Sequence, residues 1–429
     1  PRMIRNLSNV THVSAGGLFS AALTNEGKVY TWGAGDQGAL GRRISSAEDD
    51  YDQQIVPKQV EGLIPSRKAS FKVDQPREDS SVVQVATGGT QMLLLTLSGS
   101  VYISGGYRDG DSNYFRDLPP PDIPDDDPVK MKAAPEGTRD QPRHVWQMSQ
   151  RATAIDCGQS ANAAILEDHT LVTWGWDNKG ELARKISDDE RKDVLRKVNR
   201  PDGKGYDKIV NKQLLQDRFL KPLPALWDKI PNPKMHVLSV SCGDSFMVVA
   251  AREQGSGQSQ VYGTGLNKDG QLGLGDTEDR SVLTMSESSR GKHIVEVAAG
   301  LHHSLFLDLF GAAIYASGAN GKSQLGICEN PGWGDFKTTL QPVPFEDERA
   351  EFVSIAAGES HSMAVTRGGD VYTWGFGEYG KLGHGRDADE NRPRWIKKYI
   401  KSSGSTTGYT LEVSGGAQHS CLLVKDTSK

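Results

Sequence analysis

Hydrophobic and polar positions alternate along this chain in one recurring pattern. A small residue and a glycine precede a short apolar run, a polar turn reverses the chain, a second apolar run returns, and another glycine ends it. The pattern occupies residues 13–41 and returns almost unchanged at residues 355–383. A repeat of this length predicts one small structural unit that is used many times.

The glycine before the first apolar run marks the period of the repeat. It stands at Gly16, Gly88, Gly158, Gly243, Gly300, Gly358 and Gly416. Successive positions differ by 72, 70, 85, 57, 58 and 58 residues. We therefore expect seven copies of one unit, of which the first three are expanded.

Each unit contains the signals of short antiparallel strands. In the sixth copy, residues 362–366 form one apolar run, residues 367–370 a hairpin turn and residues 371–374 the returning run. A glycine-rich loop follows at 375–380, and no segment with helical periodicity separates the runs. Four short strands per unit predict a blade. Residues 1–429 are therefore expected to form a single all-β domain, a seven-bladed β-propeller.

The last copy and two expansions depart from this regularity. The seventh copy stops after its first two runs, so we expect a closing blade that is incomplete in this chain and completed by a segment upstream. Residues 105–143 are rich in Pro and Asp and predict an exposed loop. Within residues 185–236, Ser187 opens a capping box before a short charged helix expected to reach Val198, and a further helical turn is expected at 214–220.

Composition and charge narrow the classes of function. The net charge of -5 argues against a surface built wholly for phosphate contacts. No apolar run approaches the roughly 18 residues of a membrane helix, so no membrane partner is expected. The four cysteines are scattered and form no C-x-x-C pair, which is typical of a reduced nuclear or cytoplasmic setting.

Two glycine-rich segments imitate a dinucleotide fingerprint. Residues 33–38 and 375–380 both match G-x-G-x-x-G. A dinucleotide site needs a helix directly after the motif, whereas a Leu-Gly step follows here in both copies. The segments therefore predict equivalent repeat turns, and we expect no cofactor.

Four histidines near the repeat glycines are the strongest candidates for a site. His303, His361 and His419 occupy one position in successive copies, and His302 precedes the first of them. They are expected to lie in a shell around one end of the ring. They either bond the backbone of a neighbouring blade or face a partner. A metal site is not expected, because zinc takes about four ligands and the other copies offer no histidine in this position.

One loop departs from the repeat more than any other. After Gly105, residues 106–118 alternate aromatic, arginine and carboxylate side chains. Loops on rigid scaffolds often carry function, and tyrosine and arginine are common interface anchors. The alternative is an elongated surface loop without a role.

These repeats resemble those of the regulator of chromosome condensation family over essentially the whole chain. The resemblance implies a seven-bladed propeller closed by its two chain ends. The family member that acts on the small GTPase Ran carries a β-wedge with an aromatic-Arg-Asp triplet, and Tyr107, Arg108 and Asp109 match that triplet in the corresponding place. Residues 416–426 are similar to the last strand of that exchange factor.

The resemblance implies a guanine-nucleotide exchange factor for a Ran-type small GTPase in the nucleus, acting without covalent chemistry and so not as an ordinary enzyme. Tyr107, Arg108 and Asp109 would press on the GTPase near its nucleotide. The docking face would be lined by Asp244, His302, His303, His361 and His419.

Two departures keep a second hypothesis open. The family places aspartates on the docking face where this chain has Gly89 and Ser160. The basic N-terminal tail that helps such factors hold DNA and nucleosomal histones is missing from this chain. The alternative function is a propeller scaffold or regulator that binds chromatin or another protein without exchange activity.

Overall fold

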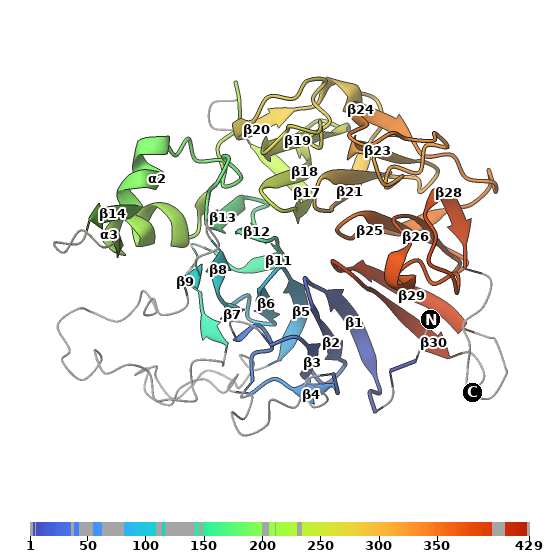
Figure 1. Ribbon diagram of the computed structural model, residues 1–429, viewed down its shortest axis with the longest axis horizontal. Coiled ribbons are helices and arrows are strands. Elements are labelled where there is room, and N and C mark those ends of the chain that lie inside the picture. Colours follow the sequence, from blue (N-terminus) through green and yellow to red (C-terminus); the bar gives the residue numbers. More distant parts are fainter. Residues whose placement is uncertain are drawn as a thin grey trace.

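The sheets of the protein are arranged in a ring around one axis, which Figure 1 shows from one end. The computed structural model describes residues 3–4, 6–35, 38–42, 55–61, 81–108, 114–115, 142–145, 148, 150–199, 206–210, 212–229, 234–396 and 408–426.

The first three blades are antiparallel four-stranded sheets. Blade 1 consists of β1 (Val10–Ala15), β2 (Phe19–Thr24), β3 (Val29–Gly33) and β4 (Lys58–Gln59). Blade 2 consists of β5 (Val82–Thr87), β6 (Gln91–Thr96), β7 (Val101–Gly105) and β10 (Arg143–His144). Blade 3 consists of β11 (Ala152–Cys157), β12 (Ala161–Leu166), β13 (Leu171–Gly175) and β16 (Leu223–Pro224).

The next three blades repeat this order, and a seventh sheet follows. Blade 4 consists of β17 (Met235–Cys242), β18 (Phe246–Glu253), β19 (Ser259–Gly265) and β20 (Arg280–Met285). Blade 5 consists of β21 (Ile294–Ala299), β22 (His303–Asp308), β23 (Ile314–Ala319) and β24 (Phe336–Pro342). Blade 6 consists of β25 (Phe352–Ala357), β26 (His361–Thr366), β27 (Val371–Gly375) and β28 (Glu390–Trp395). Among the described residues, blade 7 consists of β29 (Gly408–Gly415) and β30 (Ser420–Asp426).

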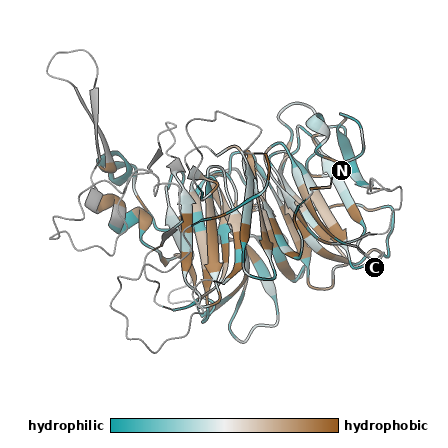
Figure 2. Cartoon of the chain, turned by 90° about the horizontal axis from the view of Figure 1, so that it is seen from below, coloured by the Kyte–Doolittle hydropathy of each residue, from teal (hydrophilic) through white to brown (hydrophobic). Residues whose placement is uncertain are grey.

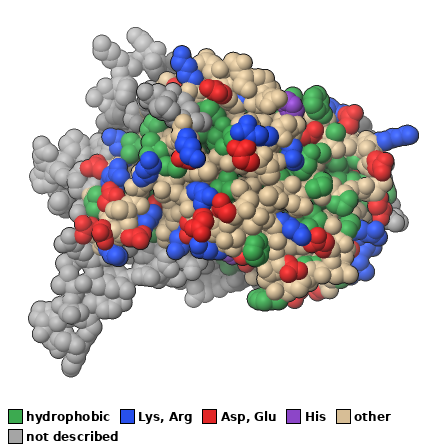
Figure 3. Space-filling view, turned by 90° about the horizontal axis from the view of Figure 1, so that it is seen from above, with side chains coloured by type: hydrophobic (Ala, Val, Ile, Leu, Met, Phe, Trp, Pro, Cys, Tyr) green, Lys and Arg blue, Asp and Glu red, His purple; other side chains and the backbone are tan. Residues whose placement is uncertain are grey.

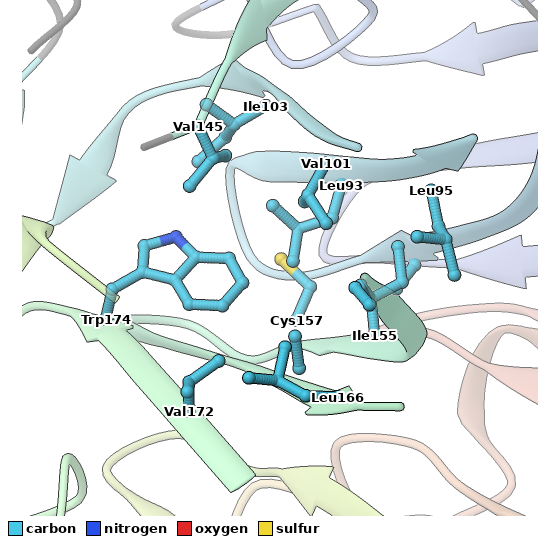
Figure 4. Packing of buried hydrophobic residues seen from close by; sticks show 13 residues of the cluster. Leu93, Leu95, Val101, Ile103, Val145, Ile155, Cys157, Leu166, Val172 and Trp174 are labelled. Carbon is cyan, nitrogen blue, oxygen red and sulfur yellow. The ribbon is translucent and has the colours of Figure 1, made fainter. Parts of the chain in front are cut away.

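The prediction of an all-β propeller with a partial closing blade is confirmed. The second strand of a blade, such as β6 or β26, is buried along its whole length, because it lies between the two neighbouring blades; in the longer β18 only the last two residues are exposed. Figure 2 shows the hydrophobic residues concentrated in these strands and the hydrophilic ones in the loops. Figure 4 shows one such layer, in which Trp174 and Cys157 of blade 3 pack against Leu93 and Ile103 of blade 2.

The innermost strand of every blade contains a bulge at the same place. The pairing register shifts by one residue at Thr11, Val83, Thr153, Leu238, Val295, Val353 and Leu411. Side chains of these strands then bridge to the backbone of the next blade. The Gln84 amide bonds both the N–H and the carbonyl of Ile155, and the Glu296 carboxylate accepts the N–H of Ile355. These hydrogen bonds join neighbouring blades, whose strands are not paired with each other in one sheet.

The ring closes where blade 7 meets blade 1. β1 lies beside β29 and β30, although they are separated by nearly the whole chain (Figure 1). The Glu412 carboxylate accepts the N–H of Val13 at 3.0 Å, and the Ser414 hydroxyl accepts the N–H of Ala15 at 2.9 Å. Hydrogen bonds from a side chain of one blade to the backbone of the next thus join blade 7 to blade 1, as they join other neighbouring blades, and close the ring.

The insertion between β13 and β16 of blade 3 contains helices, as expected. α2 (Asp188–Val194) begins with the predicted capping box, in which the hydroxyl of Ser187 accepts the N–H of Glu190. Two short helices, α3 (Lys212–Leu215) and η3 (Gln216–Leu220), confirm the second helical turn. The expected extension to Val198 is wrong, because β14 (Leu195–Asn199) pairs with β15 (Tyr206–Val210), and these inter-strand bonds replace helical ones.

Candidate functional site

One face of the ring gathers the predicted site residues. In an antiparallel blade, the turn between strands one and two and the connection between strands three and four emerge at the same end. We call this end of the ring the wedge face. It includes the turn at residues 300–303, the turn at 416–419 and the long connection after β7.

The predicted wedge begins at the root of this connection. Gly105 has a φ of +88°, and a Cβ there would lie 2.1 Å from the Thr90 carbonyl oxygen, so the position requires glycine. The N–H of Gly106 donates to that same carbonyl at 3.3 Å, and the Thr90 hydroxyl donates to the Gly106 carbonyl at 3.0 Å. The chain therefore leaves the blade in a fixed direction.

A short hairpin follows this root. β8 (Tyr107–Arg108) pairs with β9 (Tyr114–Phe115), so that Tyr107 lies opposite Phe115. Two members of the predicted triplet thus lie on one strand of a hairpin that leaves the wedge face. Asp109 and most of the expected exposed loop at 105–143 lie outside the described residues.

The three equivalent histidines link neighbouring blades. Nε2 of His303, His361 and His419 lies 2.9, 2.9 and 2.7 Å from the hydroxyl oxygens of Ser362, Ser420 and Ser20, respectively. Each serine belongs to the next blade around the ring. The expected contact with a neighbouring blade is therefore present, but it reaches a serine side chain and not the backbone.

The expectation that His303 and His361 face a partner is wrong. Both residues are completely buried, because their position begins the second strand, which lies between two blades. Burial lowers the pKa of each imidazole to about 3, so both stay neutral at physiological pH. His419 is only partly buried.

The repeat glycine makes room for these rings. A Cβ on Gly300, Gly358 or Gly416 would lie 2.4, 2.1 or 2.6 Å from Cε1 of the histidine three residues later. The Gly-x-x-His spacing is therefore explained by packing, because only glycine leaves room for the histidine ring, and it needs no catalytic role.

His302 and Asp244 remain accessible on the wedge face. Nδ1 of His302 lies 3.4 Å from a carboxylate oxygen of Asp269, and both side chains are more than a third exposed. Asp244 is half-buried, and its carboxylate accepts a bond from the Ser245 hydroxyl at 3.3 Å. These two residues can contact a partner without rearrangement of the blades.

Sequence reasoning missed a buried carboxylate below this face. Glu181 is completely buried and accepts bonds from the Ser160 hydroxyl at 2.9 Å and from the N–H groups of Asn178 and Lys179 at 2.9 and 2.7 Å. Burial raises its pKa to about 8. The sequence did contain a signal for this buried position. Glu181 directly precedes the leucine of the repeat turn, and the next blade has an uncharged residue, Gln271, at the same place.

Ion pairs join the insertion to the same region. The Asp177 carboxylate, almost fully buried, lies 2.6 Å from the Arg191 guanidinium of α2, and Arg191 also pairs with Asp188 at 2.7 Å. Arg184 is buried and donates to the carbonyl oxygen of Arg218 at 2.7 Å. The helices are therefore fixed beside the wedge face.

Within the described part of the chain, no three His, Cys, Asp or Glu side chains are arranged to hold a metal ion. None of the helices in those residues is long and apolar enough to cross a bilayer. Glu378–Gly380, in the second glycine-rich motif, forms a single 3-10 turn.

Comparisons with known proteins agree with this architecture. The family model of the RCC1-like domain matches residues 1–422. The chain is 26% identical over 432 residues to the regulator of chromosome condensation of Xenopus laevis, with 100% of this chain and 85% of that protein covered. It is 24% identical over 448 residues to the guanine nucleotide exchange factor SRM1 of Saccharomyces cerevisiae, with coverage of 98% and 80%.

The solved structures show the same fold. The crystal structure of Prp20p from Saccharomyces cerevisiae, studied for its binding to Gsp1p and histones, superposes with a TM-score of 0.70. The two sequences are 23% identical, and the superposition covers 98% of this chain and 83% of Prp20p.

Proposed function

The chain belongs to the family of RCC1-like domains, and from this premise we propose that it is a guanine-nucleotide exchange factor for a Ran-type small GTPase. The observation that carries the proposal is the hairpin of β8 and β9 on the wedge face, with Tyr107 and Arg108 on its first strand. Relatives over the full chain include an exchange factor, SRM1.

The proposed mechanism is preferential binding. The wedge and the face bind the nucleotide-free GTPase more tightly than the loaded form, and thermodynamic linkage then weakens the affinity for nucleotide by the same factor. Each tenfold gain in nucleotide release requires about 1.4 kcal/mol of preferential contact with the transition state. No bond is made or broken by the protein.

The residues divide into two roles under this proposal. Tyr107, Arg108 and Asp109 act at the nucleotide site. Asp244, His302 and His419 contribute contacts from the face, whereas the buried His303 and His361 hold neighbouring blades in place. We place the protein in the nucleus on the same basis.

One observation favours the second hypothesis, a scaffold or regulator without exchange activity. At Ser160, where the resemblance expects an exposed aspartate, the hydroxyl is buried and bonded to Glu181. At Gly89, a Cβ would lie 2.4 Å from the amide oxygen of Gln159, so a larger side chain there requires Gln159 to move. Chromatin is a candidate partner in that case, because Prp20p was studied for binding to histones.

The deciding experiment is release of a fluorescent guanine nucleotide from Ran, with and without this protein. We expect acceleration by the intact chain and loss of at least 90% of it, about 1.4 kcal/mol of barrier, in the double variant Arg108→Ala with Asp109→Ala. Absence of acceleration by the intact chain refutes exchange. Full acceleration by the double variant refutes the wedge assignment and leaves the function intact.

A further inference from the structure

A second prominent feature of the wedge face lies in blades 5 and 6, away from the wedge of blade 2. Trp333 is 92% exposed. It occupies a tight turn in which the Asp335 carboxylate accepts the N–H of Gly332 at 2.7 Å. The Asp335 carbonyl accepts the N–H of Asn320 at 2.6 Å, which ties the turn to the end of β23. The indole is therefore displayed by an ordered turn and not by a free chain.

Tyr379 is displayed in a comparable way. It is 70% exposed and has a φ of +60°, a conformation that costs a non-glycine residue about 1–2 kcal/mol. The equivalent position, three residues before the leucine of the repeat turn, is polar in the three preceding blades: Lys179, Asp269 and Lys322. The ring of Tyr379 is thus exposed at a position where the three preceding blades carry a polar side chain.

The turn of Trp333 in blade 5 is linked to Phe376 of blade 6, which stands three residues before Tyr379. The turn of Trp333 lies against Gly321, whose added Cβ would be 3.2 Å from the N atom of Gly334. The next residue, Lys322, places its ammonium group 4.5 Å from the ring centre of Phe376 in blade 6.

A second lysine lies beneath this surface and links it to blade 7. Lys381 is buried, places its ammonium group 4.6 Å from the same Phe376 ring and donates to the carbonyl oxygen of Ala417 in blade 7 at 3.2 Å. We call Trp333, Lys322, Phe376 and Tyr379 the aromatic-lysine patch, which Lys381 supports from below.

The position of the patch identifies its occupant. Trp333 and Tyr379 lie on connections between strands three and four, and so does the wedge, which places all three on one face. Blades 5 and 6 lie across the ring from blade 2 (Figure 1). A compact domain of about 200 residues has a radius of gyration of about 16 Å, so it can cover the axis and touch both sides.

We propose that the aromatic-lysine patch is a second anchor for the nucleotide-free GTPase, which it holds while the wedge acts at the nucleotide site. This inference rests on the proposed function. Trp333 and Tyr379 enter apolar depressions of the GTPase, as large aromatic side chains do at interface hot spots, and Lys322 pairs with a carboxylate beside them. The patch supplies affinity from the connections between strands three and four of blades 5 and 6, on the side of the ring opposite the wedge.

The test measures the dissociation constant for nucleotide-free Ran by biolayer interferometry. The double variant Trp333→Ala with Tyr379→Ala should weaken binding about tenfold to hundredfold, and Lys322→Glu about tenfold. The matched control is Phe310→Ala: Phe310 is 69% exposed, but it lies in the hairpin between β22 and β23 at the opposite end of the ring. The control should bind like the wild type.

The outcomes separate this inference from the proposed function. If the intact chain does not bind nucleotide-free Ran, the proposed function fails and the anchor fails with it. If the intact chain binds, and both the double variant and Lys322→Glu bind as tightly as Phe310→Ala, the anchor is refuted and the exchange function survives. The replaced aromatic side chains are exposed, so the melting temperature should stay near that of the wild type, and Lys322→Glu gives an independent test if the double variant unfolds.

Discussion

Glu181 shows how one buried side chain can set a property of the whole ring. Its carboxylate accepts three hydrogen bonds and is completely buried, and its pKa is raised to about 8. In the unfolded chain this group loses its proton near pH 4.5. Between these two pH values the folded protein holds a proton that the unfolded chain has released, so the free energy of unfolding falls as pH rises.

We predict that Glu181→Gln reduces this pH dependence. The amide resembles the protonated acid, and glutamine already occupies this position as Gln271 and Gln324. Between pH 6 and pH 8 the variant should lose less unfolding free energy than the wild type, by up to about 1.4 kcal/mol per pH unit. Urea unfolding at the two pH values measures this difference. The exposed Glu278→Gln is the control, and equal pH dependence of wild type and Glu181→Gln would contradict the prediction.

A second prediction at the residue scale concerns the repeat glycine. Gly358→Ala places a Cβ 2.1 Å from the His361 ring and 2.6 Å from the Gly416 carbonyl oxygen, and it should lower the free energy of unfolding by about 1–3 kcal/mol. Gly257→Ala is the control, because nothing lies within 4 Å of its added Cβ. Denaturant unfolding compares the two, and similar stabilities would show that the packing requirement is absent.

At the scale of an element, a buried ion pair and apolar packing hold α2 against the ring. Arg191 reaches from the helix to the side chain and the carbonyl oxygen of Asp177, both at 2.6 Å. On the insertion side, Val194 packs in a buried cluster with Trp176 and Phe219, whose rings stack at 5.1 Å. The insertion therefore shares a small buried core with blade 3, which contributes Ala161, Trp176 and Leu182.

We predict that Arg191→Met loosens this insertion. It leaves the Asp177 carboxylate buried without its cation, at a cost of about 3 kcal/mol. Faster proteolytic cleavage within residues 185–222 is the expected readout. Lys192→Met is the matched control, because Lys192 is 76% exposed and its ion pair with Asp189 contributes little. Equal cleavage rates for the two variants would mean that Arg191 does not hold the helix.

At the scale of the whole molecule, the ring depends on its closure between blades 7 and 1. Figure 3 shows acidic and basic side chains interspersed over one side of the molecule, so no single-signed field dominates that side. Specific contacts join the two blades instead. Nδ1 of His12 lies 2.5 Å from the Glu412 carboxylate, which also accepts the N–H of Val13. Burial lowers the pKa of His12, but the hydrogen bond and the charge of Glu412 outweigh it and raise that pKa above 6.5.

We predict that Glu412→Ala weakens closure in a pH-dependent way. A histidine with a raised folded pKa contributes stability below about pH 6.5, and this contribution is lost as pH rises through the folded value. Glu412→Ala should therefore lower the free energy of unfolding more at pH 6 than at pH 8. Gln84→Ala removes a similar bridge without a charge and should cost the same at both values. Thermal unfolding at each pH provides the comparison, and a pH-independent cost of Glu412→Ala would contradict the prediction.

The local features of this protein were readable from its sequence. The positions of glycines and apolar runs predicted the strands and their number per blade, because hairpin turns and strand lengths depend on residues that are close in the chain. The capping box at Ser187 was predicted for the same reason. The end of α2 was not, because Leu195 pairs with Val210 across the hairpin, a contact between residues 15 positions apart.

By itself, the sequence determined the repeating blade, the propeller class and the place after Gly105 where the chain departs from the repeat. Only the tertiary structure decided the burial, the hydrogen-bond partners and the pKa values of the side chains in these blades. The sequence left two roles open for His361, contact with a neighbouring blade or with a partner, and its bond to Ser420, 59 residues away, placed it between blades. Glu181 and the His12–Glu412 pair owe their shifted pKa values to neighbours and burial that exist only once the ring has closed, since a side chain's environment is created by distant segments and not by its own repeat.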